Sequence, residues 1–198
     1  MQRIEYRTID KSQWGEGPWQ DEPDKIQWQD EETGLPCLIV RGHMGFLCGY
    51  VGVGPDHPGY GLNYDGDNRP KSKMEIDDDG QIVITKPPLT EPLRECLQIR
   101  EVEVHGDLTY AAGCDGGLEC RSICHVPAAG EPDHAWWFGF DCGHCDDRAP
   151  GMLADMKSWR PAEEYEKYES LCGGDYRDIQ YVTSECQKLA KQLKAMEK

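Results

Sequence analysis

Basic residues are scarce in this sequence. Its 198 residues include 21 lysines and arginines against 37 aspartates and glutamates, which gives a formal net charge of -16 at pH 7. A nucleic-acid binder of the usual kind needs a basic surface that displaces counterions from phosphates, and anionic membranes attract the same kind of surface. The composition therefore argues against direct binding to nucleic acid or to a membrane. It permits attraction to a basic groove on another protein.

Long apolar runs are also missing. No stretch approaches the roughly 20 apolar residues of a membrane-spanning helix, and the N-terminal MQRIEYRTID lacks the apolar centre of a secretory signal. We therefore expect a cytoplasmic protein whose ten cysteines are reduced. The sequence also has no phosphate-binding loop of the Walker type, no G-x-S-x-G elbow and no dinucleotide fingerprint.

What the sequence does contain is a series of short strand patterns separated by long loops. Residues 35–53 hold two apolar runs around a Gly-His-Met-Gly turn, which predicts a hairpin. Residues 101–110 alternate between apolar and polar, and residues 134–142 (HAWWFGFDC) form the strongest strand pattern. Apolar residues recur every three or four positions near the C-terminus, as in an amphipathic helix. The predicted fold class is α+β, with a largely antiparallel sheet, long loops and a C-terminal helix packed on the sheet.

The length fits a single domain over residues 1–198. Within it we expect an irregular N-terminal extension over 1–35, the sheet and its loops over 36–172, and the C-terminal helix over 175–197.

Two strand patterns carry polar residues that can form a site. His105 and Asp107 lie two positions apart, so in a strand they point the same way. Asp141 ends the aromatic strand, and His144 follows it after a glycine, with Asp146 and Asp147 next. If the two strands are close, His105, Asp107, Asp141 and His144 converge on a site that can bind zinc or manganese, or act as acid and base around a small molecule. The alternative is that residues 101–109 show only the solvated face of a half-exposed strand.

A glycine-rich loop, GPDHPGYGLNYD over residues 54–65, is a candidate lid for such a site. Tyr60 and Tyr64 could fold over a ring-shaped ligand such as a nucleobase or a sugar, and His57 could add a polar contact. The alternative is a turn-rich connection whose tyrosines pack on the surface.

Cysteine spacing offers a second kind of site. The C-x-x-C of Cys142 and Cys145 and the C-x-x-x-C of Cys120 and Cys124 together supply four thiolates, which suits a structural zinc ion. The alternative for these thiols is simple burial or a loop position.

Four motifs taken together resemble a group of uncharacterised bacteriophage and prophage proteins. They are GYVGVGPDHPGYGLNYD, VHGDLTY, WWFGFDCGHCDD and YRDIQYVTSECQKLAKQL, and they extend from Gly49 to Leu193. The resemblance implies that the Asp and His of the F-D-C-x-H-x-x-D run are fixed parts of the pattern and that Cys145 is not, which weighs against zinc at Cys145. It implies no activity.

These observations lead to three functional hypotheses. The first is a phage-type accessory protein, active in the host cytoplasm against host defence or metabolism, that binds a nucleotide-like small molecule on a floor of His105, Asp107, Asp141 and His144 under Tyr60 and Tyr64. The second is a hydrolase that uses the same residues to hold a divalent metal ion. The third is an acidic inhibitor that occupies the basic nucleic-acid groove of a host defence protein or another host enzyme.

Overall fold

The computed structural model describes residues 3–64, 73–76, 82–85, 98–114, 122–127 and 134–197. Within these ranges the largest feature is a six-stranded antiparallel sheet in the order β1-β2-β3-β4-β8-β7. Its strands are β1 (Ile4–Tyr6), β2 (Lys25–Gln29), β3 (Pro36–Arg41), β4 (Leu47–Val53), β8 (Trp136–Asp141) and β7 (Tyr110–Gly113). A separate ladder pairs β5 (Lys73–Ile76) with β6 (Ile82–Thr85). The helices are the short 3-10 turn η1 (Pro18–Gln20), α2 (Pro150–Trp159), α3 (Ala162–Cys172) and α4 (Ile179–Ala195).

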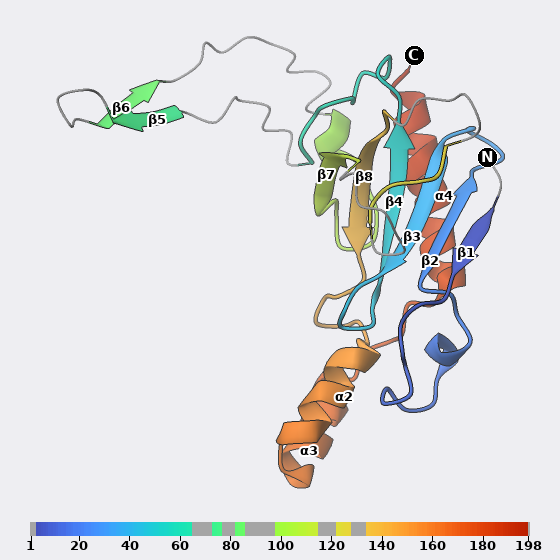
Figure 1. Cartoon of the computed structure of the whole chain (residues 1–198), viewed down its shortest axis with the longest axis vertical. Coiled ribbons are helices and arrows are strands. Elements are labelled where there is room, and N and C mark those ends of the chain that lie inside the picture. The colour runs from blue at the N-terminus through green and yellow to red at the C-terminus, as the bar shows by residue number, and fades with distance from the viewer. Residues whose placement is uncertain are drawn as a thin grey trace.

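The long helix α4 covers one face of the sheet (Figure 1). Its buried stripe is Val182, Cys186, Leu189, Ala190 and Leu193, and it packs into the main apolar cluster. Gly49 allows α4 to lie close to strand β4. A Cβ at this position would lie 2.5 Å from the Phe140 ring and 2.7 Å from the sulfur of Cys186 in α4. The predicted α+β class and the helix on the sheet are confirmed. The helix begins at Ile179, where the Asp178 side chain accepts a hydrogen bond from the Tyr181 N–H at 2.8 Å, and not at residue 175 as the sequence suggested.

The opposite face of the sheet has its own apolar cluster, formed by Leu38, Val40, Tyr50, Ala135 and Trp137. Polar side chains of β2 hold residues 122–127 near this face. The Lys25 ammonium donates to the Ser122 and Cys124 carbonyls at 2.9 and 2.8 Å, and the Gln27 amide pairs with the Val126 backbone. The prediction of an irregular extension over residues 1–35 is therefore wrong. In K-I-Q-W-Q the polar positions looked like surface, yet Lys25 and Gln27 are buried because they bind backbone.

Residues 101–110 also differ from the prediction, because only Tyr110 belongs to a strand. Gly106 and Asp107 both have positive φ angles, 63° and 66°, which are incompatible with a continuous strand. The alternation still indicates which side chains are buried, because Val102, Val104 and Leu108 all lie in the main apolar cluster. An extended segment that lies against a helix can therefore show the same alternation as a strand.

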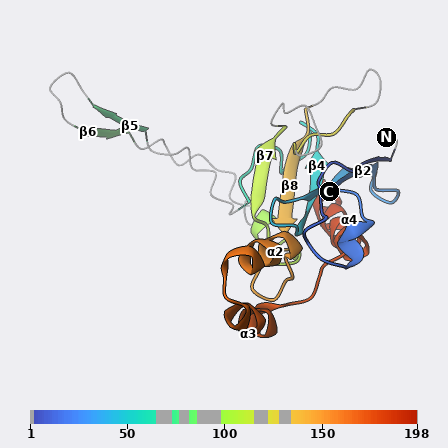
Figure 2. The ribbon, with the colours of Figure 1, turned by 60° about the horizontal axis from the view of Figure 1, so that its bottom comes forward.

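Two helices lie where only sheet and loops were expected. Helices α2 and α3 project beyond one end of the sheet (Figure 2). Neither has a side-chain hydrogen bond at its N-cap, and α3 has many exposed glutamates, so neither shows a clear apolar stripe. Start signals are present that the prediction did not take into account: Pro150 at the first position of α2, and Glu163 and Glu164 in the first turn of α3. Within the described part of the chain, no helix is both long and apolar enough to cross a bilayer.

A buried arginine joins the end of β3 to three other segments. The Arg41 side chain has no solvent exposure, and its guanidinium donates to five groups, which belong to Glu22, Pro23, Asp24, Gly45 and Tyr176. Glu22 in turn accepts from the Ile179 N–H at 3.1 Å, in the first turn of α4. Asp24 forms a further buried ion pair with Lys11 at 2.7 Å. The start of α4 is thereby fixed to the N-terminal segment and to the β3–β4 turn.

We expect Arg41→Met to lower the free energy of unfolding by about 3–5 kcal/mol, because it leaves the Glu22 carboxylate without its counter-charge and Asp24 with Lys11 alone. Urea denaturation followed by circular dichroism measures this. Arg3→Met is the control, since the Arg3 side chain is 51% exposed and its loss should change stability by less than about 0.5 kcal/mol. A loss below about 1 kcal/mol for Arg41→Met would contradict the role assigned to the network.

Candidate metal centre

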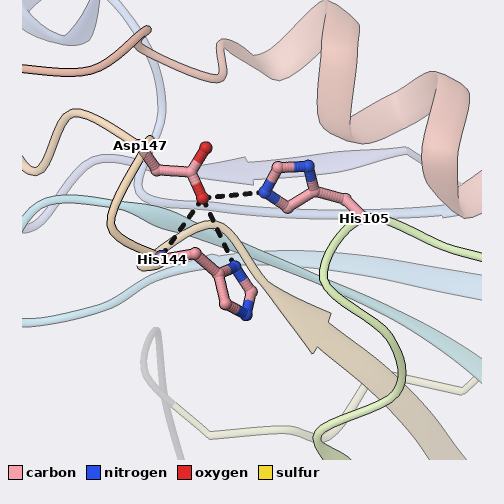
Figure 3. A group of neighbouring side chains, drawn as sticks. All are labelled: His105, His144 and Asp147. Carbon is pink, nitrogen blue, oxygen red and sulfur yellow. Dashed lines mark hydrogen bonds and ion pairs between the residues drawn. The ribbon is translucent and has the colours of Figure 1, made fainter.

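Two imidazoles and one carboxylate meet beside the end of β8. His105, His144 and Asp147 each offer a ligand atom, and these atoms all lie within 4.8 Å of one another. Figure 3 shows both rings directed at the same carboxylate oxygen of Asp147. His105 Nε2 lies 2.7 Å from this Oδ2 atom and His144 Nδ1 lies 3.4 Å from it. The centre joins residues that are 42 positions apart in the sequence.

A tight turn places His144 and Asp147. The Asp147 N–H donates to the His144 carbonyl at 3.0 Å, and the His144 N–H donates back to the Asp147 carboxylate at 3.2 Å. The turn is fixed to the segment before α4, because Arg148 N–H donates to the Asp175 carbonyl and Asp175 N–H donates to the Asp146 carbonyl, each at 3.0 Å. The carboxylate therefore has little freedom, and its side chain is only 1% exposed.

Side chains of α4 position His105 from the other side. The Gln192 amide pairs with both backbone groups of Glu103 at 2.9 Å, and Glu185 accepts from the His105 N–H at 2.8 Å. Residues 103–105 thus satisfy backbone groups through helix side chains and not through a neighbouring strand. This arrangement turns the His105 ring toward Asp147.

Gly106 allows the two histidines to approach each other. A Cβ at this position would lie 2.0 to 2.6 Å from three atoms of the His144 ring. Its φ of 63° is also one that glycine adopts without strain. The ring centroids of His105 and His144 are consequently only 5.4 Å apart.

Two residues from the start of α4 support the centre from behind. The Tyr181 hydroxyl lies 2.9 Å from His105 Nδ1, and Arg177 Nε donates to the second oxygen of Asp147 at 2.8 Å. Burial disfavours the ionised form of Asp147, but hydrogen bonds from Arg177 and His105 outweigh that cost and hold the pKa of Asp147 below its ordinary value. Burial raises the pKa of Tyr181. The centre therefore combines an ionised carboxylate with a protonated phenol.

The two carboxylates predicted for the site lie outside this group. Asp141 accepts from the Thr109 hydroxyl at 2.9 Å and from the Gly143 N–H at 3.0 Å, so it closes the end of β8. Asp107 is exposed, and its N–H donates to the Val104 carbonyl in a turn. The structure brings together His105 and His144, as predicted, but with Asp147 in place of Asp107 and Asp141.

The proposed lid lies at the other end of the sheet. Val53 pairs with Trp136 at the start of β8, whereas Cys48 pairs with Asp141 at its end, and five residues of strand span roughly 16 Å. Tyr60 packs at 6.0 Å from Trp136, and Tyr64 follows it in the same loop. His57 is buried: its Nδ1 accepts from Gly59 N–H at 2.9 Å and its Nε2 donates to the Leu193 carbonyl at 2.8 Å. These residues therefore anchor the loop to the C-terminal end of α4 and do not cover the His/Asp group.

The thiolate site is not formed as predicted. Cys124 is in a disulfide with Cys114, which also corrects the expectation that all cysteines are reduced. Cys142 is buried in the main cluster, and burial raises the pKa of its thiol. Cys145 is exposed, and Cys120 lies outside the described residues.

Sequence reasoning missed Asp147, Tyr181 and Arg177. Asp147 is the last residue of the F-D-C-x-H-x-x-D run, and its spacing of three from His144 is what a turn with an Asp side-chain hydrogen bond requires. Tyr181 and Arg177 carry no comparable local signal, because their role depends on where α4 crosses the sheet.

Comparisons of the chain with protein-family models, curated proteins and solved structures find no match. Two neutral imidazoles and an ionised carboxylate are ligands for divalent transition metals. The same groups can also hold and transfer protons.

We expect Gly106→Ala to destabilise the protein by about 2–4 kcal/mol, from the left-handed backbone conformation and from the contact with His144. Gly61→Ala is a matched control, because Gly61 has a φ of 78° but nothing within 4 Å of the added Cβ. It should lose only about 1–2 kcal/mol in a thermal or urea unfolding experiment. Equal losses at the two positions would show that the His144 contact is unimportant.

The lowered pKa of Asp147 predicts a pH dependence of stability. A carboxyl group whose pKa is lower in the folded state stabilises the protein above its unfolded pKa, about 3.9, and this contribution is lost as the pH falls through the folded value. Unfolding free energies between pH 6 and pH 3 should therefore fall less steeply for Asp147→Asn than for the wild-type protein. Asp155→Asn, at an exposed position of α2, should follow the wild-type slope.

Proposed function

We propose that this chain binds a divalent transition-metal ion, zinc foremost, through His105 Nε2, His144 Nδ1 and Asp147 Oδ2. The observation that carries the proposal is the convergence of these three ligand atoms within 4.8 Å. Imidazole suits zinc better than manganese, which prefers oxygen ligands. Three protein ligands leave a coordination position open, as in catalytic zinc sites.

The distances support this assignment. Ligand atoms about 2.0–2.2 Å from one ion lie about 3.0–3.5 Å apart. The 3.4 Å between His144 Nδ1 and Asp147 Oδ2 fits this range, while the 2.7 Å from His105 is that of a hydrogen bond. Metal binding thus requires His105 to lose its Nε2 proton and to withdraw by a few tenths of an ångström.

Tyr181 lowers the free-energy cost of that change of tautomer, because its hydroxyl can hydrogen-bond His105 Nδ1 before and after it. When Nε2 is protonated, the Tyr181 hydroxyl donates a hydrogen bond to His105 Nδ1. When Nε2 binds the metal, Nδ1 carries the proton and donates a hydrogen bond to the oxygen of the same hydroxyl. Arg177 binds only Oδ1 of Asp147, so it fixes the carboxylate and leaves Oδ2 as the single metal ligand.

His144 supplies a further indication. Its Nδ1 atom is buried and forms no hydrogen bond with any described residue, because its contact with Asp147 Oδ2 at 3.4 Å does not meet hydrogen-bond geometry. Such a buried atom is costly unless another group satisfies it. The His144 side chain as a whole is 38% exposed, compared with 14% for His105. The open position of the ion would therefore face the solvent on the His144 side.

The biological role of this centre is proposed as that of a phage-type accessory protein that holds a small ligand at the open position. A bound cation would attract the phosphate of a nucleotide-like molecule despite the net charge of -16. It would also polarise a carbonyl or phosphoryl oxygen, which is the chemistry that a hydrolase needs. An acidic inhibitor of a basic host protein is the remaining alternative, and it would need no metal.

Isothermal titration of metal-free protein with Zn²⁺ tests the proposal. We expect one equivalent to bind, and His144→Ala to weaken binding at least about 100-fold through the loss of a ligand. Asp141→Asn and Cys145→Ser are controls that should bind like the wild-type protein, because neither residue belongs to the group. Unchanged binding in His144→Ala, or equal loss in Asp141→Asn, would refute the assigned ligands.

A salt series with a captured host protein separates the inhibitor from the metal-dependent roles. Complex formation that weakens steeply with salt and survives His144→Ala would favour the inhibitor. Binding or turnover of a nucleotide that needs Zn²⁺ and is lost in His144→Ala would favour the centre.

A further inference from the structure

A hollow lies away from the metal centre, between the N-terminal segment and helices α2 and α3. Its volume is about 290 Å³, at the lower end of the range for small-molecule sites. One wall is the face of α2 that carries Pro150, Leu153, Ala154 and Lys157, four positions that share one side of a helix. Figure 2 shows the end of the molecule at which α2 and α3 lie.

Two buried apolar side chains close the floor of the hollow, and polar and charged groups make up most of its accessible lining. Leu153 is 4% exposed and Trp19 is 5% exposed. Trp19 is further fixed by its indole N–H, which donates to the Gly15 carbonyl at 3.2 Å, and by an edge contact with Tyr176 at 5.0 Å. Two partly buried rings, Trp14 and Tyr165, also line it. The exposed parts of Trp14 and Tyr165 are aromatic surfaces on which a flat ring can stack.

Some of the charged side chains around the hollow form ion pairs with described residues, and others do not. Arg148 is neutralised by Glu169 at 2.6 Å. The Lys157 ammonium lies 5.7 Å from the centroid of the Tyr165 ring and forms no ion pair with any described residue. Glu16, on the N-terminal wall, is exposed and likewise has no ion-pair partner within the described ranges. A cation is thus available on the helical wall, and a hydrogen-bond acceptor on the opposite one.

We propose that this hollow binds a small planar ring that carries one acidic group. The ring lies against Trp14 and Tyr165, above the buried floor of Trp19 and Leu153. The acidic group pairs with Lys157, and an N–H at the edge of the ring can donate to Glu16. A nucleoside monophosphate has all three features, whereas an aryl carboxylate has the ring and the acidic group but no N–H for Glu16. The proposal does not depend on the metal centre, whose ligands do not line the hollow.

The fluorescent aromatic sulfonate 8-anilinonaphthalene-1-sulfonate is a suitable probe. Titrated into the folded full-length chain, it should saturate at one site and quench tryptophan emission, because Trp14 and Trp19 line the hollow. Ala154→Trp should abolish saturable binding by filling the space. Lys157→Glu, on the exposed end of the wall, should weaken it about tenfold by reversing the charge.

Lys167→Glu, an exposed charge reversal on α3 outside the hollow, is the matched control and should leave the affinity unchanged. Competition with adenosine monophosphate and with benzoate then distinguishes the two sources of the ligand. Probe binding that persists in both Ala154→Trp and Lys157→Glu, or no saturable binding to the wild-type protein, would overturn the proposal. His144→Ala should bind the probe normally, so failure here is distinct from failure of the metal centre.

Discussion

The buried guanidinium of Arg41 is the interaction on which the remaining structure depends. It places a full positive charge at the end of β3, and the carboxylates of Glu22 and Asp24 compensate it. Because Glu22 also accepts from the first turn of α4, the same network decides where that helix starts. A buried ion network of this kind adds little to net stability, because burying charges costs much of what their pairing gains, yet removing one partner is costly because it leaves the others uncompensated.

The position of α4 then determines the chemistry of the centre. Tyr181 and Arg177 reach His105 and Asp147 from the start of the helix, while Glu185 holds the backbone of His105 one turn further on. The sheet supports the segments that carry the two histidines, and side chains from α4 and the residues before it orient His105 and Asp147. The centre is therefore a tertiary feature that no single motif contains.

The sequence predicted those parts of the fold that rest on local patterns. The hairpin over residues 35–53, the aromatic strand β8 and the stripe of α4 are each visible in one short window, and all three are present. Strand β2 was missed because its polar residues are buried by hydrogen bonds to a segment almost 100 positions away. A short stretch of sequence contains no signal for hydrogen bonds between segments this far apart.

The candidate site was half predicted for the same reason. His105 and His144 were identified from their place beside glycines and strand ends. The choice of Asp147 over Asp141 depends on a turn geometry and on Arg177, which arrives from another element. The tyrosines of residues 54–65 were assigned to the site because the sequence shows that they follow a strand, but not at which end of the sheet that strand finishes relative to β8.

The dependence of the centre on α4 has a consequence for biosynthesis. The helix leaves the ribosome after every strand of the sheet that it covers, so during translation the apolar face of the sheet and both imidazoles emerge before the groups that orient them. Until residues 177–192 are released, His105 has neither Tyr181 nor Glu185 as a partner. The mutual arrangement of His105, His144 and Asp147 in the folded chain is therefore completed only when the last helix packs on the sheet.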